Sequence, residues 1–323
     1  MFIKKYNLKK LSLCMVLLVS LTGCGGSGTI EDIIDENKIP KINIKGTSPL
    51  SNASVVLTKS DGTEIATTST DSNGSFLVEL RMSNSEVIRI DLSVGSNSQM
   101  QCRAIKCAQN VLYGQQLKEQ HISGINFTTY HYVKPSAEWG TIDESVSVNM
   151  LSTLTSVFVE KAITENSISA NNTSLAAFNN LSIKAGKVIL AALGLPEDNQ
   201  TNLLSFQPAV LNENFINTNN KLLTLADNAL TAATDNDQLV VTSISSRLLE
   251  IPLTEDIFTN NEALLSLLQL ANKHNERTRN INELLIFLPA LQNADIDFLL
   301  AVAHTSKDID INVLLQSIEK LVL

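Results

Sequence analysis

The chain has 323 residues, of which 44% are hydrophobic and 18% charged, and its formal net charge is -9. This is the composition of a globular protein that is long enough for two domains. The acidic balance offers no basic patch for a nucleic acid and no polybasic segment for anionic lipid headgroups, so we expect neither partner.

The first 23 residues have the pattern of a secretory signal. Lysines between Lys4 and Lys10 form a basic start, and an apolar run extends from Leu11 to Leu21. The run is shorter than the roughly 20 apolar residues that a membrane-spanning helix needs. We therefore expect residues 1–23 to be a signal peptide. Its removal takes away four lysines and no acidic residue, which changes the net charge from -9 to -13.

Leu21-Thr22-Gly23-Cys24 closes this run and resembles the lipobox of bacterial lipoproteins. The resemblance implies that Cys24 becomes the first mature residue and carries two or three acyl chains, as in palmitate-bearing lipoproteins. A single acyl chain would hold the protein only marginally. Gly25 stands where an Asp usually marks inner-membrane retention, which favours the outer membrane. A plain signal peptide followed by a chance cysteine is the alternative.

Residues 24–40 are expected to form a lipidated, flexible tether. The segment begins with a glycine-rich run and continues with the acidic, polar stretch TIEDIIDENKIP. Such a composition favours an extended chain, which would reach on the order of 50 Å from the bilayer. Whether the folded part faces the cell surface or the periplasm is left open.

Residues 41–134 predict an antiparallel β-sandwich of the immunoglobulin or transthyretin type. Short runs of alternating apolar and polar residues are separated by turns that contain Gly, Asn and Asp. The expected strands lie at 42–44, 53–57, 63–70, 76–80, 87–92, 99–105, 111–117 and 125–133.

A family resemblance lies in the first half of this region. The residues that carry it are Pro49, Leu50, Ala53, Val55 and Leu57, followed by Thr70, Asp71, Asn73, Gly74 and Phe76. Residues 42 to about 94 resemble the carboxypeptidase-regulatory-like domain, a transthyretin-like β-sandwich with no catalytic residues of its own. The second group is interpreted as a hairpin turn in which Gly supplies a positive φ and Phe enters the core. Calcium binding by Asp71 and Asn73 is the less favoured alternative, because the loop lacks a terminal Glu.

Two of the four cysteines remain in the folded part of the mature chain. Cys14 leaves with the signal, Cys24 carries lipid, and Cys102 and Cys107 are left as a pair. Export to an oxidising compartment favours a disulfide between them. Zinc is the rival interpretation. It would need His121 and His131 as further ligands, and two cysteines alone are weak evidence for it. We predict no metal and no cofactor.

Tyr130 and Tyr132 lie two residues apart and therefore on one face of an expected strand. They are weak candidates for a ligand platform, and packing inside the sandwich is the favoured alternative.

Residues 135–145 are expected to be a linker that holds the only tryptophan, Trp139, between Pro135 and Gly140. Residues 146–323 then show helical spacing and predict an irregular α-helical domain. Apolar stripes lie at 154–158, 222–230, 264–271 and 311–321, and Ser174 is expected to cap a helix that ends at Leu193. The predicted fold is thus α+β with two domains.

No catalytic motif or phosphate-binding loop is present in the sequence. His274 and His304 lie at expected helix ends, and Asp295 and Asp308 at expected helix starts, where the helix dipole favours such charges. Asp297 and Asp310 follow those two acids.

We predict a membrane-anchored cell-envelope lipoprotein that acts as a non-enzymatic binding or adhesion module for an envelope or surface protein or a glycan. One alternative is a periplasmic accessory or assembly factor that binds an envelope protein through its helical domain. The other is an enzyme without a recognisable motif, which should show a concave polar site with a perturbed titrating group.

Overall fold

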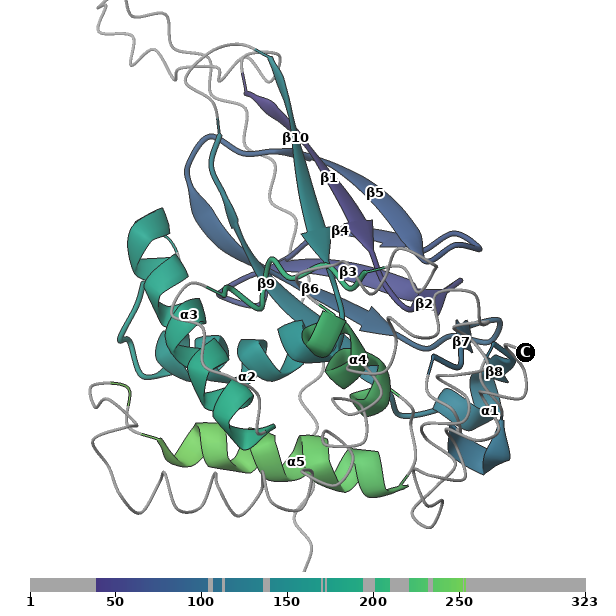
Figure 1. Cartoon of the computed structure of the whole chain (residues 1–323). Helices are drawn as coiled ribbons and strands as arrows, with labels where there is room; N and C mark the ends of the chain where they lie inside the picture. Colours follow the sequence, from purple (N-terminus) through teal and green to yellow (C-terminus); the bar gives the residue numbers. More distant parts are fainter. Residues whose placement is uncertain are drawn as a thin grey trace, which may run out of the picture. The chain divides into compact units, whose positions relative to one another are not determined.

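The structure is a computed structural model that describes residues 39–103, 107–111, 114–135, 140–169, 171, 173–193, 201–209, 221–231, 235–251 and 253. All of them belong to the compact unit formed by residues 37–323. The strands precede the longer helices along the chain, so the fold is α+β, as predicted (Figure 1).

The strands are β1 Lys41–Thr47, β2 Leu50–Ser51, β3 Ser54–Lys59, β4 Glu64–Ser69, β5 Ser75–Arg81, β6 Glu86–Ser93, β7 Gln99–Gln101, β8 Gln116–Lys118, β9 Asn126–Val133 and β10 Thr141–Ser147. The helices are the 3-10 turn η2 Ala108–Asn110, α1 Glu119–Ile122, α2 Met150–Thr164, α3 Leu175–Ala192, α4 Lys221–Leu230 and α5 Asp235–Glu250.

The described strands form three sheets that are mainly antiparallel. The sheet β4-β3-β6-β9 is antiparallel throughout, and so is the small sheet β2-β7-β8. In the third sheet, β10-β1-β5, strand β1 pairs antiparallel with β5 and parallel with β10. The alternation of apolar and polar residues explains the strands. Strand β1, for example, buries Ile42 and Ile44 and leaves Lys45 exposed.

Strand β10 corrects the predicted linker at 135–145 and the predicted start of the helical region at 146. All seven residues of β10 pair with β1, from Thr141 beside Lys41 to Ser147 beside Thr47. The strand was missed because the acidic Glu144 lies on its less exposed side and hides the apolar alternation. Glu144 pairs there with His131 of β9, which compensates its partial burial.

One hydrophobic cluster joins the sheets and the helices. It contains Ile44 of β1, Ile90 of β6, Leu154 of α2 and Ile189 of α3. The division of the chain into a separate sandwich and a separate helical domain stays a prediction, but the described helices share a core with the strands.

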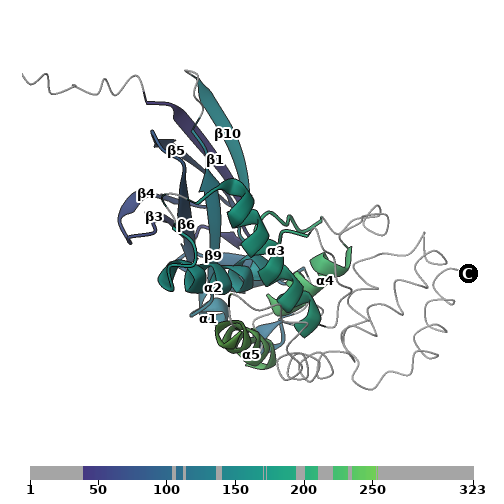
Figure 2. The same cartoon turned by 90° about the vertical axis from the view of Figure 1, so that its left-hand side faces the viewer.

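Helix α2 lies against β9 and bonds to that edge strand (Figure 2). Thr153 accepts a hydrogen bond from the Thr128 amide through Oγ1 at 3.0 Å. Ser152 and Ser156 donate their hydroxyls to the Thr128 carbonyl at 3.3 and 3.2 Å. Both backbone groups of Thr128 on this sheet edge are thus satisfied by helix side chains.

The ends of the helices follow local signals. Ser174 caps α3 by accepting from the Ala177 amide at 3.2 Å, and α3 ends at Ala192, in agreement with the predicted cap and stop. Helix α2 buries Leu154 and Phe158 as predicted. Its Lys161 donates to the carbonyl oxygens of Leu249, in the last turn of α5, and of Ile251, just past its end, which fixes the end of that helix.

Two predicted strands are shorter than expected. The strand expected at 99–105 is β7, which ends at Gln101, and the strand expected at 111–117 is β8, which begins at Gln116. The Cys102–Cys107 disulfide lies between them and turns the chain. The short helix α1 was not predicted.

Candidate binding site

A cavity of about 580 Å³ lies at the N-terminal end of α2. Its lining comes from the chain between β1 and β2, the corner before β5, the disulfide segment, the end of β10, the segment before α4, and α4 itself. These residues are Thr47, Ser48, Pro49, Asn73, Gln101, Arg103, Gly114, Ser147, Val148, Asn149, Gln207, Pro208, Ala209, Asp227 and Asn228. Amide and hydroxyl side chains dominate the list, so the cavity is a polar one.

Asp227 on α4 is the buried acid of this cavity, with 3% of its surface exposed. Its Oδ1 accepts a hydrogen bond from the Leu151 amide at 3.0 Å, in the first turn of α2. Burial raises the pKa of Asp227 to about 6, against the opposing effects of the hydrogen bond from Leu151 and the charge of Arg103. A carboxylate at a helix N-terminus is also favoured by the helix dipole.

Asn149 is the N-cap of α2 and is also buried. Its Oδ1 accepts from the Ser152 amide at 2.8 Å, and the Ser152 hydroxyl accepts from the Asn149 amide at 3.0 Å, which completes a capping box. Its Nδ2 donates to the Phe206 carbonyl at 2.9 Å. The cap therefore fixes the start of α2 and also ties it to the segment that precedes α4.

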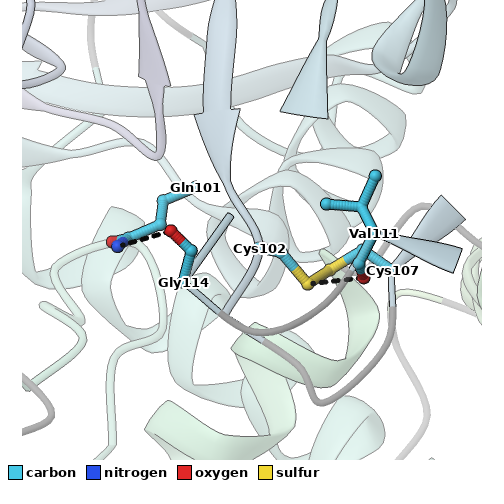
Figure 3. The surroundings of a disulfide bond; sticks show 5 residues. All are labelled: Gln101, Cys102, Cys107, Val111 and Gly114. Atoms are coloured by element: carbon cyan, nitrogen blue, oxygen red, sulfur yellow. Dashed lines mark hydrogen bonds between the residues drawn. A yellow bond between two sulfur atoms is a disulfide. The ribbon is translucent and has the colours of Figure 1, made fainter. Parts of the chain in front are cut away.

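The disulfide segment contributes Arg103, a half-buried cation. The structure joins Cys102 to Cys107, the pairing that the sequence analysis favoured over zinc (Figure 3). Sγ of Cys102 lies 3.6 Å from the Val111 carbonyl oxygen, and this is a packing contact because an oxidised sulfur carries no proton. The neighbouring Gln101 donates its Nε2 to the Gly114 carbonyl at 3.4 Å. The cross-link thus restrains the chain on both sides of Arg103.

The motif at 70–76 forms a turn, but not a hairpin. Asp71 accepts hydrogen bonds through Oδ1 from the Asn73 and Ser75 amides at 2.8 and 2.9 Å. Gly74 has φ +77°, as expected, and Phe76 is buried. Strands β4 and β5 belong to different sheets, so the turn is a corner that takes the chain from one sheet to another. The prediction failed on this point because the same turn chemistry serves both purposes.

The corner is also tied to the residue that precedes β3. Thr70 accepts from the Ala53 amide through Oγ1 at 2.9 Å. The engagement of the Asp71 oxygen by backbone amides supports the turn over the calcium alternative. Asn73 is exposed and reaches the cavity.

Tyr130 and Tyr132 lie under helices rather than on an open face. Tyr130 is 5% exposed and belongs to a small cluster with Phe178 of α3, whose ring centroid lies 6.2 Å from that of Tyr132. Burial raises the pKa of Tyr130 to about 12. The burial of Tyr130 favours the packing interpretation, with helices in place of the opposite sheet, and the ligand platform stays a prediction.

The two histidines of the zinc alternative have other partners. His131 pairs through Nε2 with Glu144, and His121 accepts from the Lys118 amide through Nδ1 at 3.1 Å, at the start of α1. In the part of the chain that the structure describes, no group of three His, Cys, Asp or Glu side chains could hold a metal ion.

Sequence reasoning missed Arg103, Asn149, Asp227 and Asn228. A signal for two of them was present: Thr224, Asp227, Asn228 and Thr231 repeat at the spacing of one helical face, and all four are buried. The apolar stripe of the same helix is the stronger pattern in the sequence and hides this polar face. A buried polar stripe on a helix needs partners, and its presence indicates a polar interface.

Several predicted features lie outside the described residues. They are the signal peptide, the tether with Cys24 up to residue 38, Trp139, the helices expected at 264–271 and 311–321, His274, His304 and the acids Asp295, Asp297, Asp308 and Asp310. Among the helices that the structure describes, none combines the length and apolar character needed to cross a membrane.

No protein-family model matches the chain, and no curated protein or solved structure shows significant similarity to it.

Proposed function

We propose that this protein is a membrane-anchored lipoprotein of a bacterial cell envelope, in the outer membrane, and that its folded part is a non-enzymatic binding module. The lipobox-like Leu21 to Cys24 supports the anchor. The Cys102–Cys107 disulfide supports an oxidising compartment, where such bonds persist.

The observation that carries the binding function is the polar cavity at the start of α2. Asn73 of the corner, Arg103 of the disulfide segment and Asp227 of α4 are far apart in the sequence and line one space. Its volume of about 580 Å³ falls in the range of small-molecule sites, and convergent polar groups are the usual mark of such sites.

We further propose that the sheets form a β-sandwich of the carboxypeptidase-regulatory-like type, which would serve as the scaffold of this site. Support comes from the buried side chains of β1 and β6, which share one cluster, and from the corner with its buried Phe76. Strand β10 is an addition to the pattern that the resemblance implied.

One observation favours the enzyme alternative: a buried carboxyl, Asp227, with a pKa of about 6 beside a polar cavity. The same carboxyl holds the Leu151 amide at the start of α2. Capping accounts for its position, and burial accounts for its pKa, so binding is the simpler function for this site.

The anchor is tested by the substitution Cys24→Ala. We expect the variant to move from the membrane fraction to the soluble fraction, because it cannot carry acyl chains. Radiolabelled palmitate should be incorporated by the wild type and not by the variant. A variant that stays in the membrane fraction would contradict the anchor.

The binding function is tested in living cells by a photoreactive residue at Gln207, which is exposed at the cavity. We expect a discrete cross-linked product whose mass identifies the occupant. The matched control is the same photoreactive residue at Glu64, an exposed position of β4 that does not line the cavity. Identical products from both positions, or none from Gln207, would contradict binding at this site.

A further inference from the structure

We propose that the cavity at the start of α2 binds a short peptide through a carboxylate that pairs with Arg103. This inference rests on the proposed function, because it names the ligand class of the same cavity.

Arg103 is the charge in the cavity that a ligand can pair with. Asp227 is buried, and its Oδ1 is occupied by the Leu151 amide. Asn149 engages the Ser152 amide, so the first turn of α2 is already capped and is no open anion site. Arg103 is half-buried, and although its charge acts on Asp227, no Asp or Glu of the described residues lies within ion-pair distance of it. A half-buried guanidinium in this position favours an anionic partner.

The remaining walls match the hydrogen bonding of a peptide. Asn73, Gln101 and Gln207 present exposed side-chain amides, each with a donor and an acceptor group. Asn228 is buried in the wall, and its Nδ2 has no acceptor in the described part of the chain. A backbone with alternating N–H and C=O groups would complement these amides. The described lining includes no aromatic side chain, so it offers no stacking surface for a base or a sugar ring.

The charge balance favours a carboxylate over a phosphate. Among its described residues the lining holds one cation, Arg103, and one acid, Asp227, so their formal charges cancel when both are ionised. A monoanionic carboxylate can take both parallel N–H bonds of a single guanidinium. A phosphate dianion would add a second negative charge close to Asp227 without a second cation to offset it.

The test is calorimetric titration of the purified full chain in mild detergent with three probes: tri-alanine, tri-alanine amide and inorganic phosphate. We expect tri-alanine to bind, and the amide to bind about tenfold more weakly or worse, because charge-assisted hydrogen bonds are lost. We expect no measurable heat from phosphate. Equal affinity for the acid and the amide, or no binding of tri-alanine, would overturn the proposal. Binding of phosphate in preference to tri-alanine would overturn it as well.

Variants then locate the carboxylate. Arg103→Gln should weaken tri-alanine binding about tenfold or more. Arg103→Lys should retain part of the affinity, because lysine keeps the positive charge but lacks the two parallel N–H donors of a guanidinium. The matched control is Arg89→Gln, which removes a half-buried arginine paired with Asp91 and Glu160 outside this cavity. Affinity that is unchanged in Arg103→Gln, with an unaltered circular dichroism spectrum, would contradict the role of Arg103.

The outcomes also separate this proposal from the proposed function. A cross-linked product at Gln207 together with failure of tri-alanine to bind would show that the cavity is a binding site for another ligand class. Failure of both experiments would remove the binding function itself.

Discussion

The corner at 70–76 and the start of α2 both supply a carboxylate acceptor for free backbone amides, but from different distances along the chain. In both, a side-chain oxygen accepts hydrogen bonds from backbone amides where the chain changes direction. In the corner, Asp71 binds the amides of Asn73 and Ser75, two and four residues away. At the start of α2, Asp227 binds the amide of Leu151, 76 residues away. The first arrangement is local and the second depends on the packing of α4.

The contrast explains how the cavity is built. Asn73 comes to it on a turn that the side chain of Asp71 sets, whereas Asp227 and Gln207 come to it through the helical region. A site with one locally fixed wall and one wall fixed by distant contacts should respond differently to changes on its two sides. The following substitutions test that difference, from the largest expected effect to the smallest.

Phe76→Ala should cause the largest loss of stability. The ring of Phe76 is buried above Gly46, where even an added Cβ would come within 1.9 Å of it. Removal of a buried phenylalanine ring costs about 3–5 kcal/mol of unfolding free energy, which urea denaturation would measure. The control is Leu77→Ala at the next residue, which is 58% exposed and should cost far less. A loss below about 1 kcal/mol for Phe76→Ala would contradict the core role of the ring.

Gly74→Ala should destabilise the corner more than Gly62→Ala destabilises its own turn. Both glycines have positive φ, +77° and +84°, so both variants carry the backbone strain of about 1–2 kcal/mol. Only at Gly74 would the new Cβ lie 2.2 Å from a backbone oxygen, that of Ser48. The difference between the losses of unfolding free energy in the two variants therefore measures the energetic cost of this clash. Equal losses would mean that the Ser48 carbonyl moves away at no cost.

Asp227→Asn should remove a pH dependence of stability. The folded-state pKa of Asp227, about 6, lies above the ordinary value of 3.8, so the folded state binds the proton more tightly than the unfolded state does. The unfolding free energy should therefore rise as the pH falls from about 6 to 4, by at most roughly 1.4 kcal/mol per pH unit from this group. The cost of the buried charge is fully present above pH 6.

The measurement for this prediction is urea unfolding of wild type and Asp227→Asn at several pH values. Effects of the other carboxyl groups cancel in the difference between the two proteins. A difference that does not change between pH 4 and 7 would show that Asp227 is not perturbed by burial.

Sequence reasoning succeeded where structure follows from near neighbours. The alternation of Ile42 and Ile44 identified β1, and Ser174 identified the start of α3. The turn chemistry of Asp71 and Gly74 was also visible. In each case the decisive contacts lie within one element or one turn.

Sequence reasoning failed where a buried polar residue has its partner far away in the sequence. Glu144 hid β10 because its partner, His131, lies on another strand. The polar stripe that holds Asp227 is visible in the sequence, but its role is not, because its partner is the α2 amide of Leu151. The cavity combines several such contacts, so its position could not be derived before the packing of α4 was known.

The most direct test of this account is amide hydrogen exchange, measured by nuclear magnetic resonance, in wild type, Asp227→Ala, Asp227→Asn and Asp71→Ala. We expect Asp227→Ala to speed exchange of the Leu151 amide about tenfold or more, and Asp227→Asn to preserve its protection through the remaining side-chain oxygen. The Ser75 amide should be affected only by Asp71→Ala. Unchanged protection of Leu151 in Asp227→Ala would contradict the claim that α4 fixes the start of α2 and with it the wall of the cavity.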